Sequence, residues 1–269
     1  MSVSGARLAT SLPFISPAVT AQIEHKDRPM LEVDLHAHSH FSLCGNHSVL
    51  EMLQRAGDNG MLGLAITDHG PALNGRLNST FFDRLHDPIP GIRLLKGVEA
   101  NILDKKANTD FPGKFLPFCD IVLAGIHEQC LSGVAEREYT DLLIKTMNVN
   151  PYVDIITHPD NYGQYIDYQK LAAAARDRGV ALELNNSKTA LKRLPAERTR
   201  ALITACKETG CRMVVCSDAH AVNEVGDDRA VAPLLQQAEF PEELLITAHA
   251  QSVFDFIRER RVSKLQAQR

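Results

Sequence analysis

Short hydrophobic segments recur along this chain, and each gives way to polar residues within a few positions. The segments are rich in Val, Ile and Leu and do not alternate with polar positions, a pattern typical of strands that are covered on both faces. Seven of them predict β-strands, at residues 31–35, 62–66, 93–98, 121–125, 153–157, 180–184 and 213–216. Because most of these strands are separated by helical patterns, we expect parallel pairing through helical crossovers.

Apolar positions spaced three and four residues apart predict the helices. The clearest case covers residues 48–59, where Gly60 marks the end of the helix. Further helices are expected at 136–147, 167–178, 195–209, 227–237 and 252–260, with a helical turn near 81–85 and irregular loops at 70–91 and 103–117. No glycine-rich phosphate loop follows the first strand, so a TIM-like α/β barrel is a better interpretation than a dinucleotide-binding sheet.

The first 29 residues differ from the rest of the chain. They are rich in Ser, Ala, Thr and Pro and hold no acidic residue before Glu24. A targeting or regulatory arm would have such a composition, but we expect a disordered extension, with Met30 as a natural start just before the first strand. Residues 30–269 are then expected to form a single barrel domain, which is a common size for one α/β core.

Composition and charge narrow the class of protein. The 269 residues carry a formal net charge of −4 and no long basic run, which argues against nucleic acid as the main partner. No apolar run reaches the roughly 18 residues that suggest a membrane span. The six cysteines form no CxxC pair, so we interpret them as reduced, mostly buried thiols of a cytoplasmic protein and not as zinc ligands. The sequence does not indicate the oligomeric state.

The polar residues that follow the predicted strands are often histidines or acids. His36 and His38 follow the first strand at spacing i, i+2, so an extended backbone would point both imidazoles to one side. Six of the eleven histidines and two acids lie at or just past predicted strand ends: His36, His38, His69, Glu99, His127, His158, Asp218 and His220. In a barrel, the loops after these strand ends build the active site, so we expect the eight side chains to meet there.

Histidine and carboxylate ligands suit Zn²⁺, Mn²⁺ or Fe²⁺ in a catalytic site. Eight such groups exceed the needs of one ion, so two or three ions are expected, and Glu99 on a central strand is the natural bridging carboxylate. Metal ions a few ångströms apart can clamp both oxygens of a phosphoryl transfer. Hydrolysis of a phosphate ester is therefore the first reaction to consider.

Seven short motifs stand in order along the chain: residues 34–38 (DLHAH), 66–71 (ITDHGP), 97–102 (GVEANI), 124–128 (AGIHE), 157–159 (THP), 182–187 (LELNNS) and 217–220 (SDAH). Together they resemble the motifs of the PHP (polymerase and histidinol phosphatase) superfamily, and most closely those of its small stand-alone, YcdX-like phosphatases. The resemblance covers about residues 30–260. It implies a distorted (β/α)7 barrel with a trinuclear metal centre, usually described as zinc.

The resemblance also implies a role for each ligand. By matching motif, the first ion would be held by His36, His38, Glu99 and Asp218, and the third by Glu99, His127 and His158. The second ion would be held by His69, His220 and one more histidine. The loop 39–48 departs from the family pattern at this point, so the third ligand is open. We prefer His47, because residues 48–50 match the residues after the family ligand, and His40 is the alternative.

The implied activity is that of a metal-dependent hydrolase of phosphate monoesters, acting on a small phosphorylated substrate through a metal-bound hydroxide. Glu99, Asp218 and His220 would be closest to catalysis. Asp34 and Asp68 either orient imidazoles or tie down loop amides. Asn185 and Asn186 either bond the substrate or ligand carboxylates, or cap the turn after them.

Other interpretations stay open at this point. The same site would suit a histidinol phosphatase, or a nuclease or phosphodiesterase. A non-catalytic, metal-dependent metabolite-binding protein is the alternative from another class. Five cations stand in loops on the expected active face, and each by itself is expected to be a solvated surface charge: Arg76, Lys114, Lys188, Lys192 and Arg193.

Overall fold

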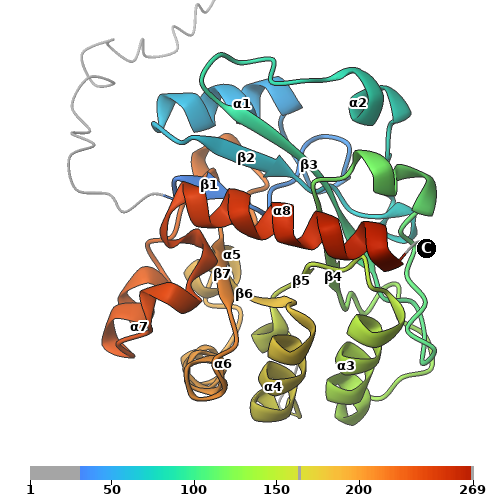
Figure 1. Cartoon of the computed structure of the whole chain (residues 1–269), viewed down its shortest axis with the longest axis vertical. Helices are drawn as coiled ribbons and strands as arrows, with labels where there is room; N and C mark the ends of the chain where they lie inside the picture. The colour runs from blue at the N-terminus through green and yellow to red at the C-terminus, as the bar shows by residue number, and fades with distance from the viewer. Residues whose placement is uncertain (1–30, 163–164, 268–269) are drawn as a thin grey trace, which may run out of the picture.

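The sheet is a parallel barrel whose strands follow one another in chain order. In the computed structural model, which describes residues 31–162 and 165–267, each strand pairs in parallel with the next (Figure 1). The strands are β1 (Val33–Asp34), β2 (Gly63–Ile66), β3 (Arg93–Asn101), β4 (Ile121–Gly125), β5 (Ile155–Ile156), β6 (Ala181–Asn185) and β7 (Met213–Cys216). A parallel bridge between Ala37 and Ala219 joins the segments after β1 and β7, so the barrel is nearly closed. The expected distorted (β/α)7 fold is confirmed, whereas the expected disorder of residues 1–29 lies outside the described residues.

Helices fill most of the crossovers between the strands. They are α1 (Val49–Asp58), α2 (Ser79–Arg84), α3 (Tyr139–Val149), α4 (Tyr168–Arg178), α5 (Asn186–Ala190), α6 (Ala196–Thr209), α7 (Ala232–Gln237) and α8 (Ala250–Ala267). Between β3 and β4, by contrast, the chain runs through a loop and a 3-10 segment, η3 (Gly113–Phe118). A search of the described residues found no helix with both the length and the apolar character needed to cross a membrane.

Some observed elements differ in extent from the predicted ones. The helix expected from residue 227 begins only at Ala232, because the Asp227 carboxylate accepts the backbone N–H of Arg229 and favours a turn. The last helix is longer than expected and runs from Ala250 to Ala267. Strand β3 continues to Asn101, which places Glu99 inside the strand instead of past its end.

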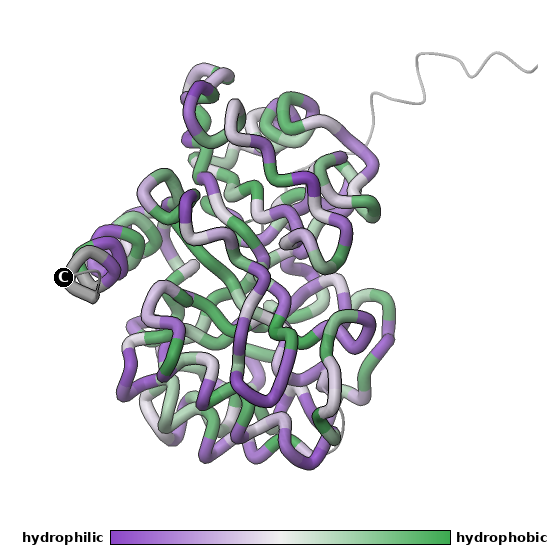
Figure 2. Tube along the Cα trace, turned by 90° about the vertical axis from the view of Figure 1, so that its right-hand side faces the viewer, coloured by the Kyte–Doolittle hydropathy of each residue, from purple (hydrophilic) through white to green (hydrophobic). Residues whose placement is uncertain are grey.

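Strand residues pack alternately into the barrel and against the helices. On β4, Ile121 and Leu123 belong to a core inside the barrel, whereas Val122 and Ala124 belong to the larger core under the outer helices. Hydrophobic stretches run through the body of the molecule, and hydrophilic stretches gather at its outer turns (Figure 2). The interior core also includes Phe256 of α8, so this helix closes one end of the barrel.

Helix α8 lies across the amino-terminal ends of the strands (Figure 1) and is held there by buried ion pairs. Arg260 Nε lies 3.0 Å from Asp154 Oδ1, and Lys264 Nζ lies 2.5 Å from Asp154 Oδ2. The same carboxylate accepts the backbone N–H of Val122 at 2.8 Å. Asp154 therefore joins α8 to the strands β4 and β5, and the opposite, carboxyl end of the barrel carries the candidate site.

Candidate metal centre

The eight side chains singled out from the sequence converge at the carboxyl ends of the strands. Glu99 lies on β3, and the others lie in the segments after strands: His36 and His38 after β1, His69 after β2, His127 after β4, His158 after β5, and Asp218 and His220 after β7. His127 and His220 are half-buried and the other six are buried. Parallel strands of one barrel end at the same rim, which is why residues 180 positions apart in the chain meet here.

Glu99 lies at the centre of the group and is fully buried. Its two oxygens approach five imidazole nitrogens: Oε2 approaches His69 Nδ1 (2.8 Å), His36 Nε2 (3.4 Å) and His38 Nε2 (3.5 Å), and Oε1 approaches His158 Nε2 (3.1 Å) and His127 Nε2 (3.6 Å). The two oxygens thus face different sets of imidazoles. A carboxylate in such a position can be shared between neighbouring ions.

The ligand atoms form a continuous cluster. Three groups have ligand atoms that all lie within 4.8 Å of one another: His36, His38 and Asp218; His38, His69 and His220; and His69, Glu99 and His127. The groups share His38 and His69, and the Glu99 carboxylate connects His158 to them. All eight expected strand-end residues are therefore part of one assembly.

The cluster has the chemistry of a cation site. Several of its buried polar atoms make no hydrogen bond to the described residues, including Glu99 Oε2, His127 Nδ1 and His158 Nδ1. His69 Nδ1 is also without a hydrogen bond of normal geometry, although it lies 2.8 Å from Glu99 Oε2. Leaving buried polar atoms unpaired is costly, and imidazole and carboxylate donors suit zinc or a related divalent ion. The residues present therefore fit a metal centre.

The pKa values inside the cluster are set by burial and by the charges of neighbouring imidazoles and carboxylates. Burial opposes the charge of Glu99, but the neighbouring His36 ring holds the pKa of its carboxyl well below the ordinary range. Burial lowers the pKa of His127 to about 3, so this ring is neutral and able to bind an ion. At His69, burial is outweighed by the Glu99 charge, which raises the pKa to about 10. An ion that binds His69 must therefore displace a proton, so metal binding is expected to weaken as the pH falls.

The backbone is strained at two of the candidate ligands. His158 and Asp218 both adopt left-handed conformations, with φ of 31° and 52°. Such conformations cost a non-glycine residue about 1–3 kcal/mol and persist where neighbouring contacts fix them. The His158 N–H donates to Glu183 Oε2 at 2.7 Å, which is one such contact.

Glu183 on β6 contacts a candidate ligand, His36, on the side away from Glu99, a role that was not predicted from the sequence. It is fully buried, and its Oε1 lies 2.6 Å from Nδ1 of His36, so the opposite ring nitrogen of His36 faces Glu99. Carboxylates that bind the second nitrogen of a metal-ligating histidine fix its tautomer and orientation. An acid in the middle of an otherwise apolar strand was the signal that could have identified it, because buried charges need partners.

Glu183→Gln is expected to weaken metal binding without removing a ligand. The amide cannot hold the His36 ring with a full negative charge, and loss of such an outer partner typically costs about 10–100-fold in metal affinity. Competition with a chromophoric chelator measures this. Glu51→Gln, at the exposed start of α1, is the control and should leave the affinity unchanged. Equal affinities in the Glu183→Gln variant and the native protein would show that Glu183 does not position His36.

Asp34 and Asp68 tie down loops. Asp34 accepts backbone N–H groups of His36, Ser217 and Gly226, and Asp68 accepts the backbone N–H and the hydroxyl of both Ser39 and Ser42. Of the two roles expected for these acids, the structure favours hydrogen bonding to backbone amides of the loops. They fix the loops that carry the histidines after β1 and β7.

Asn185 combines both of the roles expected for it. Its side chain caps α5, and its Nδ2 donates to Glu183 Oε2 and Asp218 Oδ2, both at 3.2 Å. Asn186 differs, because its side chain accepts the backbone N–H of Ala230 at 2.9 Å. Asn185 therefore belongs to the cluster, whereas Asn186 holds the loop before α7.

Lys188 is part of the cluster and not a solvated surface charge as expected. Its side chain is only 18% exposed, and Nζ lies 3.0 Å from Asp218 Oδ2. Burial opposes the charge of Lys188, but Asp218 raises the pKa of its ammonium group. A cation paired with a candidate ligand therefore lies at the edge of the site, and the short helix α5 that places it was missed in the sequence.

The third histidine expected for the second ion is not among the three groups. His47, His40 and Cys44 all lie outside them, and His47 Nδ1 is buried without a hydrogen bond to any of the described residues. The loop turns back at Gly45, where a Cβ atom would come within 2.0 Å of the Ser39 carbonyl oxygen. This tight turn presents Cys44, whose side chain interacts with those of His69 and His220.

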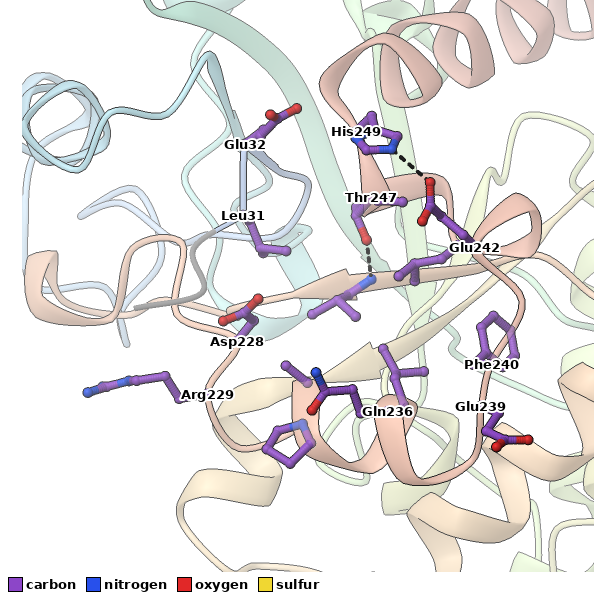
Figure 3. A pocket seen from close by; sticks show the side chains of 16 residues that line it. Leu31, Glu32, Asp228, Arg229, Gln236, Glu239, Phe240, Glu242, Thr247 and His249 are labelled. Atoms are coloured by element: carbon purple, nitrogen blue, oxygen red, sulfur yellow. Dashed lines mark hydrogen bonds and ion pairs between the residues drawn. The ribbon is translucent and has the colours of Figure 1, made fainter. Parts of the chain in front are cut away.

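A separate cavity of about 830 Å³ lies beside α7 and the start of α8 (Figure 3). Its lining includes Leu31, Asp228, Glu239, Phe240 and His249, and none of the candidate ligands. Asp228 is half-buried there, and its Oδ1 makes no hydrogen bond to the described residues. Burial, with a contribution from Asp227, raises the pKa of Asp228 to about 6 from its ordinary 3.8.

Asp228→Asn is expected to stabilise the protein above about pH 6. The folded-state pKa is raised, so the folded protein holds a proton that the unfolded chain releases between pH 3.8 and about 6. Stability from this group is therefore present at low pH and lost as the pH rises. The melting temperature of the variant should exceed that of the native protein at about pH 7.5 and match it at about pH 4. Glu239→Gln, an exposed acid on the same cavity, is the control, and equal gains in both variants would contradict the explanation.

Fold and site together define a metal-binding α/β-barrel protein. The PHP domain family model matches residues 34–174. A protein named "Probable phosphatase" from Acetivibrio thermocellus is 35% identical over 232 residues, which cover 85% of this chain and 96% of that protein. Another protein of that name, from Shewanella halifaxensis, is 34% identical over 232 residues, or 85% of this chain and 93% of the relative. The chain belongs to the PHP domain family.

Solved structures share the fold at low sequence identity. Histidinol phosphate phosphatase from Lactococcus lactis, complexed with zinc, L-histidinol and phosphate, has a TM-score of 0.53 and 18% identity, covering 78% of this chain and 94% of that one. A chain of an archaeal ribonuclease P bound to mature tRNA has a TM-score of 0.57 and 16% identity, covering 85% and 90%. Because the two neighbours differ in activity, these likenesses support the fold alone.

Proposed function

We propose that the protein is a metal-dependent phosphatase that hydrolyses phosphate monoesters at a centre of three ions, most simply zinc. The observation that carries this proposal is the two-sided environment of Glu99, whose Oε1 and Oε2 face different imidazoles. The relatives named probable phosphatases, which match most of the chain, support the reaction class. Residues 30–269 would form one barrel domain, in a cytoplasm that keeps the six free thiols reduced.

The residues would share the ions in the order that the motifs imply. His36, His38, Glu99 and Asp218 would hold one ion, Glu99, His127 and His158 another, and His69 and His220 part of a third. When bound, the ions would polarise the phosphoryl group and lower the pKa of a water molecule toward neutrality. Glu99 and Glu183 would keep the rings in place, and Lys188 at the rim would offer an ammonium group to a phosphate oxygen.

Metal analysis combined with turnover tests the proposal. The protein loaded with zinc or manganese is expected to hold about three ions per chain and to hydrolyse an aryl phosphate monoester faster than the matching bis-aryl diester. Histidinol phosphate and a single-stranded oligonucleotide belong in the same panel, because faster turnover of either would replace monoester hydrolysis in general with that narrower activity. A loaded protein that hydrolyses none of these compounds would overturn the proposal.

A further inference from the structure

One reactive side chain beside the cluster has no role in the proposed centre. Cys44 lies in the loop after β1, and its side chain is exposed, unlike those of the four buried cysteines. Its side chain interacts with the rings of both His69 and His220, the two histidines for which the motifs leave the third ligand open. Ser42, two residues earlier, accepts the backbone N–H of His69 at 2.9 Å, so the loop is anchored beside this histidine. The cysteine therefore lies beside the two histidines whose further ligand the motifs do not assign.

The loop around Cys44 is built to hold this position. Gly45 packs against the Ser39 carbonyl so closely that no side chain would fit, and its N–H donates to Ser42 O at 3.2 Å. The next residue, Asn46, donates its backbone N–H to the carbonyl oxygen of His220 at 2.9 Å. The backbone that follows Cys44 is thus fixed to His220, whose ring interacts with the Cys44 side chain.

We propose that Cys44 is a thiolate ligand of the ion held by His69 and His220, in the place expected for His47 or His40. The inference rests on the proposed function in requiring an ion at these two histidines. An independent observation supports a cation there, because ring nitrogens of His38, His69 and His220 lie within 4.8 Å of one another. On binding, the sulfur forms the bond to the metal and the thiol proton passes to solvent.

A thiolate changes which ion the position prefers. Soft sulfur ligands favour Zn²⁺ over Mn²⁺ or Mg²⁺, whereas the other positions have only imidazole and carboxylate donors. Zinc is therefore expected at the position of Cys44 even when manganese fills the rest of the centre. The exposed sulfur also makes this ion the one most open to thiol reagents and oxidants.

Cobalt substitution tests the ligand directly. The native protein loaded with Co²⁺ should show a near-ultraviolet thiolate-to-metal charge-transfer band, which Cys44→Ser should abolish together with about one ion per chain. Cys44→His should restore the ion without the band, which separates lost ligation from misfolding. Cys130→Ser, which changes a half-buried cysteine in the segment after β4, should retain both the band and the ion.

Thiol reactivity of the native protein gives a second readout that needs no variant. Cys44 should react slowly with a disulfide reagent when metal is bound and at least about tenfold faster after chelation. A metal-loaded protein with no charge-transfer band, or loss of one ion in His47→Ala but not in Cys44→Ser, would overturn the inference and leave the phosphatase proposal intact. A native protein that binds no metal would overturn both.

Discussion

Replacing Glu99 by Gln is expected to remove the metal centre while the barrel stays folded. The amide keeps the shape of the side chain but has no negative charge, and its NH₂ group points a donor at ions or imidazoles that need an acceptor. Five imidazole nitrogens lie within 3.6 Å of the Glu99 oxygens, so the substitution affects five candidate ligands at once. We expect kcat/KM to fall by about 1,000-fold or more, equivalent to about 4 kcal/mol of transition-state stabilisation.

Metal content measured on the same preparation separates the possible causes. The Glu99→Gln variant should lose the ions that the carboxylate bridges, and circular dichroism should still report a folded α/β protein. Glu128→Gln is the matched control, because this exposed acid follows His127 directly, and its activity and metal content should be those of the native protein. Full activity with a full complement of ions in Glu99→Gln would rule out a bridging role.

Asp154→Asn is expected to destabilise the protein by about 3–5 kcal/mol, far from the site and without a change in its chemistry. The substitution leaves Arg260 and Lys264 buried beside a neutral amide, although both have side chains less than 8% exposed. For a chain of this size the melting temperature should fall by on the order of 10 °C. Thermal unfolding in the presence of a chelator measures it, so that bound ions do not add to stability.

Two further variants show whether the buried pairs are the cause. Asp141→Asn removes a carboxylate paired with Lys170, but both side chains are more than half exposed, so the cost should stay below about 1 kcal/mol. Replacing Asp154, Arg260 and Lys264 together by Leu, Met and Met removes the charges as a unit and should restore most of the stability. If Asp154→Asn costs no more than Asp141→Asn, the ion pairs do not hold α8 in place.

The barrel and most of its cluster could be predicted from local patterns in the sequence. Buried parallel strands produce unbroken apolar runs, and their carboxyl ends meet at one rim, so His38 and Asp218 could be brought together without any knowledge of loops. The ends of two helices could also be predicted, since Gly179 and Gly210 end α4 and α6 in left-handed conformations. Only the β3–β4 crossover, which lacks an α-helix in the described chain, departs from the regular alternation.

The residues whose roles were missed depend on tertiary contacts. Glu183 looked like one residue of an apolar strand, and its role requires the knowledge that His36 lies opposite. Lys188 looked like a loop cation because α5 is only five residues long and has no periodic pattern. Cys44 and His47 are three positions apart in one loop, and the sequence does not show how the loop turns at Gly45 and brings Cys44 beside His69.

Helix α8 also determines when the barrel can be completed during synthesis. Each strand pairs with its predecessor in the chain, so β1 to β7 can associate as they leave the ribosome. Asp154, by contrast, must wait for Arg260, 106 residues later, and the interior core stays open at one end until Phe256 arrives. A nascent chain arrested before α8 should therefore expose an apolar opening and an acid without its two cationic partners, which makes it a substrate for chaperones and proteases until the final helix is released.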